Sequence, residues 1–252
     1  MGRLRRGLGG HALLALACVA SLGAQQSRDD LHKNFFQTQG SRFIVRFEGG
    51  EDFILANRAI DMLDQAYERI GAALVYYPQE SITIILYTQQ QFQDVTRAPA
   101  WAAGAFDGKI RIPIRGALAK PEELQRVLSH ELAHAIVHTI APKHVPFWLN
   151  EGLAVTLEPE GSAGADVELA RSRIRIPFSR LADSFRGLTA DEARIAYAQS
   201  AVVARRLLED VGGPTMVTIL RDLAAGQSFK SAYEGRVFLS YEAFLSTVDA
   251  SR

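Results

Sequence analysis

The sequence predicts an α+β fold, in which an N-terminal lobe of mixed α/β structure with an edge strand precedes a mostly helical C-terminal lobe. Up to about residue 118, β-branched and alternating apolar segments are interleaved with helical patterns. After Pro121 the apolar residues recur almost entirely at helical spacings. Because no repeat or low-complexity linker separates the two parts, we expect a single domain over residues 25–252, with lobes over about 35–118 and 119–252.

The first lobe is expected to contain strands and two helices. Alternating apolar residues over 43–47 predict a strand, and the β-branched run over 81–87 predicts a central one. Apolar residues spaced by three and four over 52–74 predict a long amphipathic helix. A short helix is expected over 89–95, directly after the central strand.

The stretch GAFDGKIRIPI, residues 104–114, predicts a hairpin, because Asp107-Gly108 is a strong turn dipeptide. Pro113 in its second strand cannot donate to a ladder, so we expect this strand to lie at an edge of the sheet. Such an edge can bind an extended peptide substrate as an added strand. Alternatively, Pro113 and the basic residues beside it only protect the edge.

The second lobe is expected to begin with two helices. Pro121 and the acidic residues after it favour a helix start, and this helix is expected to reach about Thr139. A second helix is predicted over 147–158, where Pro159 stops it. The small residues over 160–166 predict a loop.

A long helix follows this loop. Thr189 is its predicted N-cap, and Glu192 three residues later completes a capping box. Gly212 is expected to end the helix, because glycine is favoured just past a helix C-terminus. Two or three shorter helices are expected to complete the chain.

Residues 1–24 have the layout of a secretory signal peptide, with three arginines, an apolar run and small residues before the expected cleavage after Ala24. We therefore expect a protein exported to the periplasm or secreted from a bacterial cell envelope. The apolar run is too short to span a bilayer comfortably, so no stable membrane span is expected after signal removal. A lipoprotein signal ending at Cys18 is the alternative. Removing the signal also removes the chain's single cysteine, which excludes disulfides and thiolate chemistry.

The composition is that of an ordinary soluble globular protein, with 48% hydrophobic and 22% charged residues. The 28 basic and 28 acidic residues give a formal net charge of zero. This balance gives no reason to expect nucleic acid or an anionic membrane surface as a partner. The oligomeric state is left open.

The chemistry is expected in the stretch RVLSHELAHAIVH, residues 126–138. Residues four apart on a helix lie about 40° apart around its axis, so His130 and His134 project side by side and can bind one ion. Glu131 lies about 100° further round, where a carboxylate can take a proton from a metal-bound water. The alternative is a core helix whose histidines bind no metal.

A catalytic zinc takes three protein ligands and keeps a fourth position for water, so a third ligand is needed. His138 is a poor third ligand, because three histidines on one straight helix cannot surround a tetrahedral ion well; it is expected to cap the helix C-terminus instead. His144 lies ten residues after His134 without a glycine turn between them. Glu151, in PFWLNEGLA, can face the two histidines if the proline-bounded connector folds the second helix back onto the first.

The pair HELAH and WLNEG resembles the motifs of the gluzincin metallopeptidases, and specifically the peptidase MA-like group. The same WLNEG phrase occurs in the zinc aminopeptidase family. The resemblance covers roughly residues 42–247 and implies a gluzincin-like zinc peptidase fold. It also implies Zn²⁺ as cofactor, a peptide or protein as substrate, His130, His134 and Glu151 as zinc ligands, and Glu131 as general base.

Two departures from these families affect the prediction. The aminopeptidases carry Gly-x-Met-Glu-Asn on an edge strand, whereas this chain has GAFDG, which lacks that glutamate and favours an endopeptidase. Val155 stands where thermolysin-like enzymes have an aspartate that supports a zinc histidine. Glu158 is a possible substitute, but its place near the helix end predicts that it faces solvent.

Tyr197, on the later long helix, is the candidate for stabilising the oxyanion, a role that a tyrosine or histidine fills in several gluzincins. Alternatively, its ring only packs helix against helix. The function favoured by these patterns is a zinc endopeptidase of the cell envelope. An aminopeptidase-type exopeptidase and a peptide-binding scaffold without catalysis are the alternatives.

Overall fold

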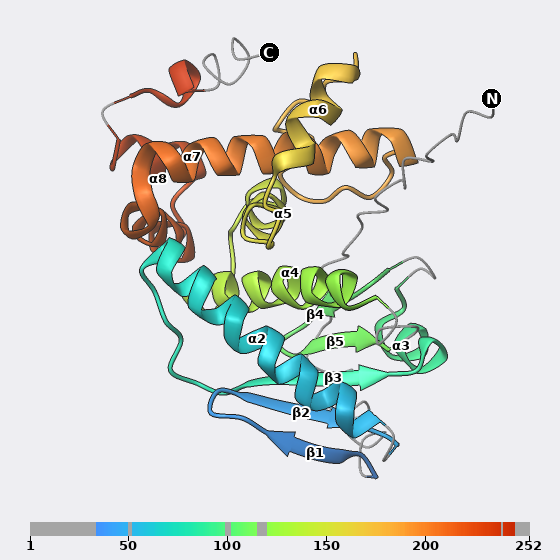
Figure 1. Cartoon of the computed structure of the whole chain (residues 1–252). Helices are drawn as coiled ribbons and strands as arrows, with labels where there is room; N and C mark the ends of the chain where they lie inside the picture. Colours follow the sequence, from blue (N-terminus) through green and yellow to red (C-terminus); the bar gives the residue numbers. More distant parts are fainter. Residues whose placement is uncertain (1–33, 50–51, 99–101, 115–119, 238, 245–252) are drawn as a thin grey trace, which may run out of the picture.

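The computed structural model describes residues 34–49, 52–98, 102–114, 120–237 and 239–244, so the predicted signal peptide lies outside the described residues. It confirms the α+β class: a five-stranded sheet with helices forms the first lobe, and the second lobe is largely helical (Figure 1). The elements in chain order are β1 (Phe36–Gln39), β2 (Phe43–Phe47), α2 (Phe53–Leu74), β3 (Ile82–Tyr87), α3 (Gln89–Thr96), β4 (Ala105–Phe106), β5 (Ile110–Pro113), α4 (Pro121–Ile140), α5 (Phe147–Thr156), α6 (Ala163–Arg171), α7 (Ala190–Ala224) and α8 (Phe229–Glu234).

The strand order in the sheet is β1-β2-β3-β5-β4. The three inner strands β2, β3 and β5 are parallel, and each outer strand pairs antiparallel with its neighbour. The predicted strands over 43–47 and 81–87 and the hairpin are confirmed, whereas β1 is an additional strand.

The expectation that the second hairpin strand forms the edge is wrong for most of that strand. β5 lies between β3 and β4, so the two-residue β4 is the edge on this side. Pro113 pairs with Tyr87 of β3 and lies beyond the last β4 pairing, that of Ala105 with Arg111. The proline is therefore tolerated because it lies in the part of β5 that extends past the end of β4 and has no strand of the described residues on its outer side.

Side-chain alternation divides the sheet into two packed faces. One face packs against α2 and α4, which lie on the same side of the sheet in Figure 1. From β3, Ile84 and Leu86 point to that face, while Ile85 and Tyr87 point to the other, where α3 packs. Both faces of β3 are thus buried, as expected of a central strand.

Arg111 is buried on the α3 side of the sheet and does not guard an exposed edge, as the protective alternative required. Its side chain is 1% exposed. Its Nε donates to both carboxylate oxygens of Asp107 at 2.9 and 3.0 Å, and its Nη1 donates to the Tyr87 hydroxyl at 2.5 Å. This ion pair ties the hairpin turn to the central strand.

The helical lobe is built on α7, against which α5 and α6 pack (Figure 1). The predicted capping box of Thr189 and Glu192 is confirmed at its start. Gly212, with φ of 75°, breaks the helical backbone where the end of the helix was predicted, and a further helical segment continues to Ala224.

The predicted loop over 160–166 is wrong in its second half, because α6 begins at Ala163. Only Leu169 of α6 is fully buried, and it packs with Ile195 and Ala198 of α7. This helix is stabilised by its neighbour, and its short, weakly apolar sequence gave little periodic signal.

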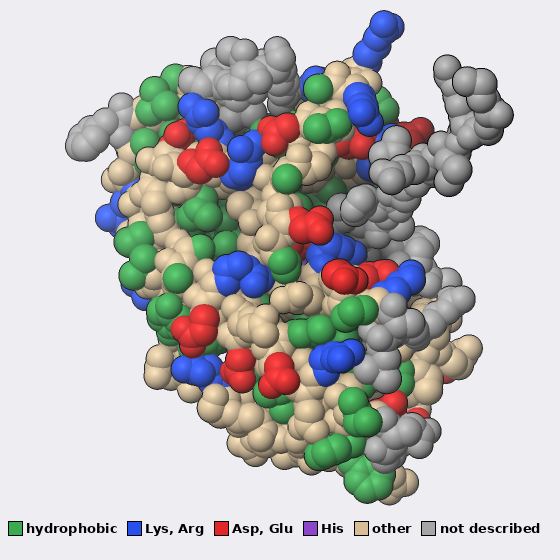
Figure 2. Space-filling model, in the orientation of Figure 1, with side chains coloured by type: hydrophobic (Ala, Val, Ile, Leu, Met, Phe, Trp, Pro, Cys, Tyr) green, Lys and Arg blue, Asp and Glu red, His purple; other side chains and the backbone are tan. Residues whose placement is uncertain are grey.

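Charged side chains of both signs are interspersed over the face shown in Figure 2. Among the described helices, none is both long and apolar enough to cross a membrane.

Candidate metal centre

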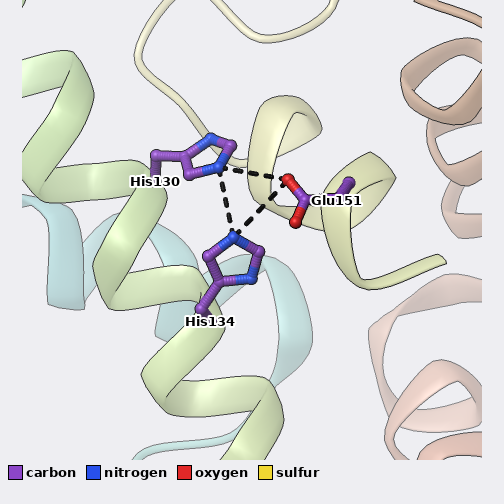
Figure 3. A group of neighbouring side chains, drawn as sticks. All are labelled: His130, His134 and Glu151. Atoms are coloured by element: carbon purple, nitrogen blue, oxygen red, sulfur yellow. Dashed lines mark hydrogen bonds and ion pairs between the residues drawn. The ribbon is translucent and has the colours of Figure 1, made fainter. Parts of the chain in front are cut away.

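His130 and His134 lie one turn apart on α4, on the side of the helix that faces α5 (Figure 3). Both are 2% exposed. Their Nε2 atoms are 3.2 Å apart, and the two rings meet edge to face. The helical spacing therefore produces the side-by-side arrangement that the sequence predicted.

Glu151 reaches the histidines from α5. The start of α5 is fixed by backbone hydrogen bonds, in which the N–H groups of Phe147 and Trp148 donate to the carbonyls of Ala182 and Leu181. Glu151 is completely buried, and its Oε2 lies 3.5 Å from Nε2 of His130 and 3.7 Å from Nε2 of His134. The connector thus brings the second motif onto the first.

The three ligand atoms have the spacing that a tetrahedral zinc requires. Ligands at about 2.0–2.1 Å from one tetrahedral ion lie roughly 3.3–3.4 Å from one another. The observed distances of 3.2, 3.5 and 3.7 Å bracket this value. Neither carboxylate oxygen of Glu151 has a hydrogen-bond partner among the described residues, although a buried carboxylate demands one. A bound cation would satisfy that demand.

The other two histidines considered as third ligands are not part of this group. Within the described part of the chain, the only cluster of metal-ligating residues is His130, His134 and Glu151. His138 lies in the last turn of α4 with its ring against Phe106, and its capping of the helix remains a prediction. His144 is exposed in the connector between α4 and α5.

Glu131 lies beside this cluster on α4 and is 1% exposed. Both of its oxygens lack hydrogen-bond partners among the described residues. In the metal-free protein, burial raises the pKa of Glu131 to about 8. The negative charges of Glu151 and Glu158 contribute to this rise, and the positive charge of His130 opposes it. In the metal-free protein this environment therefore favours the protonated carboxyl group at neutral pH.

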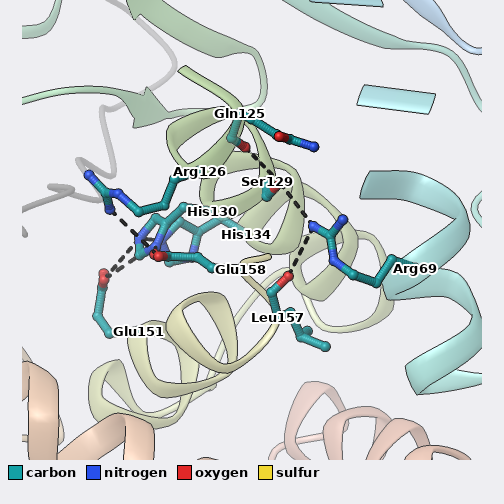
Figure 4. A network of polar contacts seen from close by, with 9 residues as sticks. All are labelled: Arg69, Gln125, Arg126, Ser129, His130, His134, Glu151, Leu157 and Glu158. Carbon is teal, nitrogen blue, oxygen red and sulfur yellow. Dashed lines mark hydrogen bonds and ion pairs between the residues drawn. The ribbon is translucent and has the colours of Figure 1, made fainter. Parts of the chain in front are cut away.

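Glu158 is the functional residue that the sequence analysis placed wrongly. It is buried, and one carboxylate oxygen accepts a hydrogen bond from Nδ1 of His130 at 2.8 Å (Figure 4). Its other oxygen lies 3.6 Å from the guanidinium of Arg126. A carboxylate on Nδ1 holds the ring so that Nε2 faces the metal position.

A periodic signal for Glu158 was present. It lies seven residues after Glu151, and seven residues make almost two full helical turns, so the two carboxylates share a face. Helix α5 ends at Thr156, but the backbone of Leu157 stays close to helical angles, with φ of −91° and ψ of 5°. Glu158 therefore still points to the face that carries Glu151.

Replacing Glu158 with glutamine is expected to weaken zinc binding by about 10–100-fold, because the charge that orients His130 and raises its basicity is lost. Competition with a metal chelator measures this affinity. Glu160→Gln is the matched control, since Glu160 is exposed only two residues away. Equal affinity in Glu158→Gln and wild type would contradict the supporting role.

The pKa values of the two histidines differ in the metal-free protein. Burial alone would lower the pKa of His130, but its interactions with the carboxylates of Glu151 and Glu158 outweigh burial and raise it to about 10. Burial lowers the pKa of His134. His130 therefore holds a proton at neutral pH that must leave before its nitrogen binds a metal.

Zinc affinity is consequently expected to increase with pH up to about 10, by about tenfold per pH unit for one released proton. Chelator competition at several pH values between about 6 and 8, corrected for the chelator's own protonation, measures the slope. An affinity that does not change over this range would show that His130 is already neutral.

Tyr197 projects from α7 and is 4% exposed. Its ring meets that of Phe185 edge to face at 5.0 Å between centroids, so the packing role is real. Burial raises the pKa of its hydroxyl, and the negative charges of Glu151 and Glu131 raise it further. The hydroxyl therefore stays protonated at neutral pH, and its role towards an oxyanion remains a prediction.

Comparisons with known proteins concern the family and the fold of the chain. A family model described as the peptidase MA superfamily matches residues 59–241. Among solved structures, aminopeptidase A of Legionella pneumophila in complex with aspartic acid is similar in fold, with 13% identity and a TM-score of 0.53. The alignment covers 84% of this chain but 28% of that one, so this chain spans less than a third of that protein. A search of curated protein sequences gives no significant match.

Proposed function

Because the chain belongs to the peptidase MA superfamily, we propose that it is a zinc-dependent endopeptidase, which hydrolyses internal peptide bonds in proteins or peptides of the bacterial cell envelope. Family membership makes the chain a metallopeptidase, and the His-His-Glu cluster is a metal site typical of zinc peptidases. The observation that carries the proposal is this buried triangle of ligand atoms with the carboxylate of Glu131 beside it.

In this proposal His130, His134 and Glu151 hold the zinc. When bound, zinc supplies a Lewis acid that polarises the peptide carbonyl and acidifies water. Glu131 takes a proton from the attacking water and later delivers it to the leaving amine. The protonated Tyr197 hydroxyl donates a hydrogen bond to the developing oxyanion.

The ion pair between Asp107 and Arg111 favours an endopeptidase over an aminopeptidase. An aminopeptidase needs an uncommitted carboxylate near the site to bind the substrate's free α-ammonium group. Asp107 is the only acidic residue in the hairpin over 102–114, and Arg111 binds both of its oxygens. The hairpin beside Glu131 therefore offers no free carboxylate for a substrate amine.

Export to the cell envelope is supported by the basic and apolar pattern of residues 1–24. An extended peptide substrate can bind as an added strand along an exposed sheet edge. Such an edge is formed by β4 and by the part of β5 that extends past the end of β4.

Metal content and cleavage of end-blocked peptides together test the proposed function. We expect about one zinc per wild-type chain and a large loss of zinc in Glu151→Ala, with Glu160→Ala as an exposed control. Peptides with an acetylated N-terminus and an amidated C-terminus should be cut. Cleavage only of peptides with a free N-terminus would indicate an exopeptidase, and a wild-type protein that takes up no zinc would favour the scaffold.

A further inference from the structure

We propose that Gly104 is a positioning residue for Glu131: because this residue directly before β4 has no side chain, the β4–β5 hairpin can close against the face of α4 that carries the base. This inference rests on the proposed function for the role of Glu131 in catalysis. The steric relation between the two residues stands independently of it.

The contact is too close for a side chain at position 104 unless a neighbouring side chain moves. A Cβ atom placed on Gly104 would lie 2.7 Å from Oε1 and 2.9 Å from Cγ of Glu131. It would also lie 3.0 Å from a methyl group of Val127 on the same helix. Non-bonded carbon atoms approach to roughly 3.5–4.0 Å at optimal separation, so something must move by several tenths of an ångström or more.

The hairpin is the part that resists movement. Both residues of β4 pair with β5, and β5 pairs with the central strand β3. The buried Arg111 then joins the turn residue Asp107 to Tyr87 of β3. Ala105, next to Gly104, packs in the same small core as Tyr87.

Glu131 is the part that yields. Neither of its oxygens is held by a hydrogen bond from the described residues, so packing determines where the carboxylate lies. Val127 is β-branched and stiff at χ1, which leaves it little freedom to withdraw. The backbone of Gly104 therefore limits the rotation of the Glu131 side chain. A methyl group at position 104 would displace the carboxylate from the position in which it acts as base.

The first test is Gly104→Ala, with Gly164→Ala as the control because a Cβ at Gly164 meets no heavy atom within 4 Å. We expect Gly104→Ala to keep its zinc and its KM but to lose about 10²-fold in kcat, the effect of a displacement of about 1 Å at a reacting group. Gly164→Ala is expected to match wild type. A kcat of Gly104→Ala within about twofold of wild type, with zinc bound, would overturn the proposal.

A second readout needs no turnover. Unfolding of the metal-free protein by denaturant is compared for wild type, Gly104→Ala, Glu131→Ala and the double variant. If the added methyl group collides with Glu131, its destabilising effect is smaller when Glu131 is already alanine. Equal loss in both backgrounds would overturn the proposal, even if Gly104→Ala is too unstable for kinetic assays. If wild type cuts no peptide but the coupling is present, the proposed function fails and the steric relation stands.

Discussion

Glu131→Gln is expected to lower kcat for peptide hydrolysis by about 10²–10⁴-fold, the contribution typical of a positioned general base. The amide has nearly the size and shape of the carboxylate but cannot take a proton from water. Because Glu131 is buried and its oxygens make no hydrogen bonds with the described residues, the neutral amide removes no contact and no ion pair from the fold. We therefore expect zinc content and thermal stability to be preserved.

Steady-state kinetics on an end-blocked peptide, with zinc measured in the same samples, test this expectation. Glu122→Gln is the matched control, because Glu122 is exposed in the first turn of the same helix. Cleavage by Glu131→Gln at the wild-type rate would exclude Glu131 as the base. Loss of zinc together with activity would instead assign the carboxylate to metal binding.

Gly152→Ala is expected to lower the free energy of unfolding by more than about 3 kcal/mol, the upper end of usual overpacking penalties. A Cβ on Gly152 would lie 2.3 Å from the carbonyl oxygen of Ser200 and 2.8 Å from Cβ of Ala204, both on α7. The clashing oxygen belongs to a helix backbone and cannot rotate away. The gain in helix propensity, about 1 kcal/mol, is too small to compensate.

Denaturant unfolding of the metal-free protein measures this effect without a contribution from zinc binding. Gly164→Ala in α6 is the matched control, with open space at its Cβ and an expected gain of at most about 1 kcal/mol. Since Glu151 precedes Gly152, separation of α5 from α7 should also weaken zinc binding. A Gly152→Ala variant as stable as wild type would show that α5 and α7 can separate without cost.

The parts of the site that could be predicted are those set by local periodicity. The spacing of His130 and His134 on one helix determines that both imidazoles point the same way, whatever surrounds them. The capping box at Thr189 and the glycine break at Gly212 are likewise local, because each involves backbone groups within a few residues. Glu151 was identified through the resemblance of its motif, and its approach to the histidines depends on how the connector folds.

Tertiary structure alone decided the contacts between segments that are distant in sequence. Glu158 lies at a helix end, where sequence favours exposure, but the turn after α5 lies over α4 and buries it against His130. Arg111 looks like a charge that protects an edge, yet β4 and α3 cover it and Asp107 neutralises it. Gly104 was predicted only as the first residue of the hairpin, and its close approach to Glu131 follows from how the hairpin packs against α4. The sequence by itself determined the ligands' types and spacing, whereas the orientation and confinement of those side chains came from packing, which no local pattern encodes.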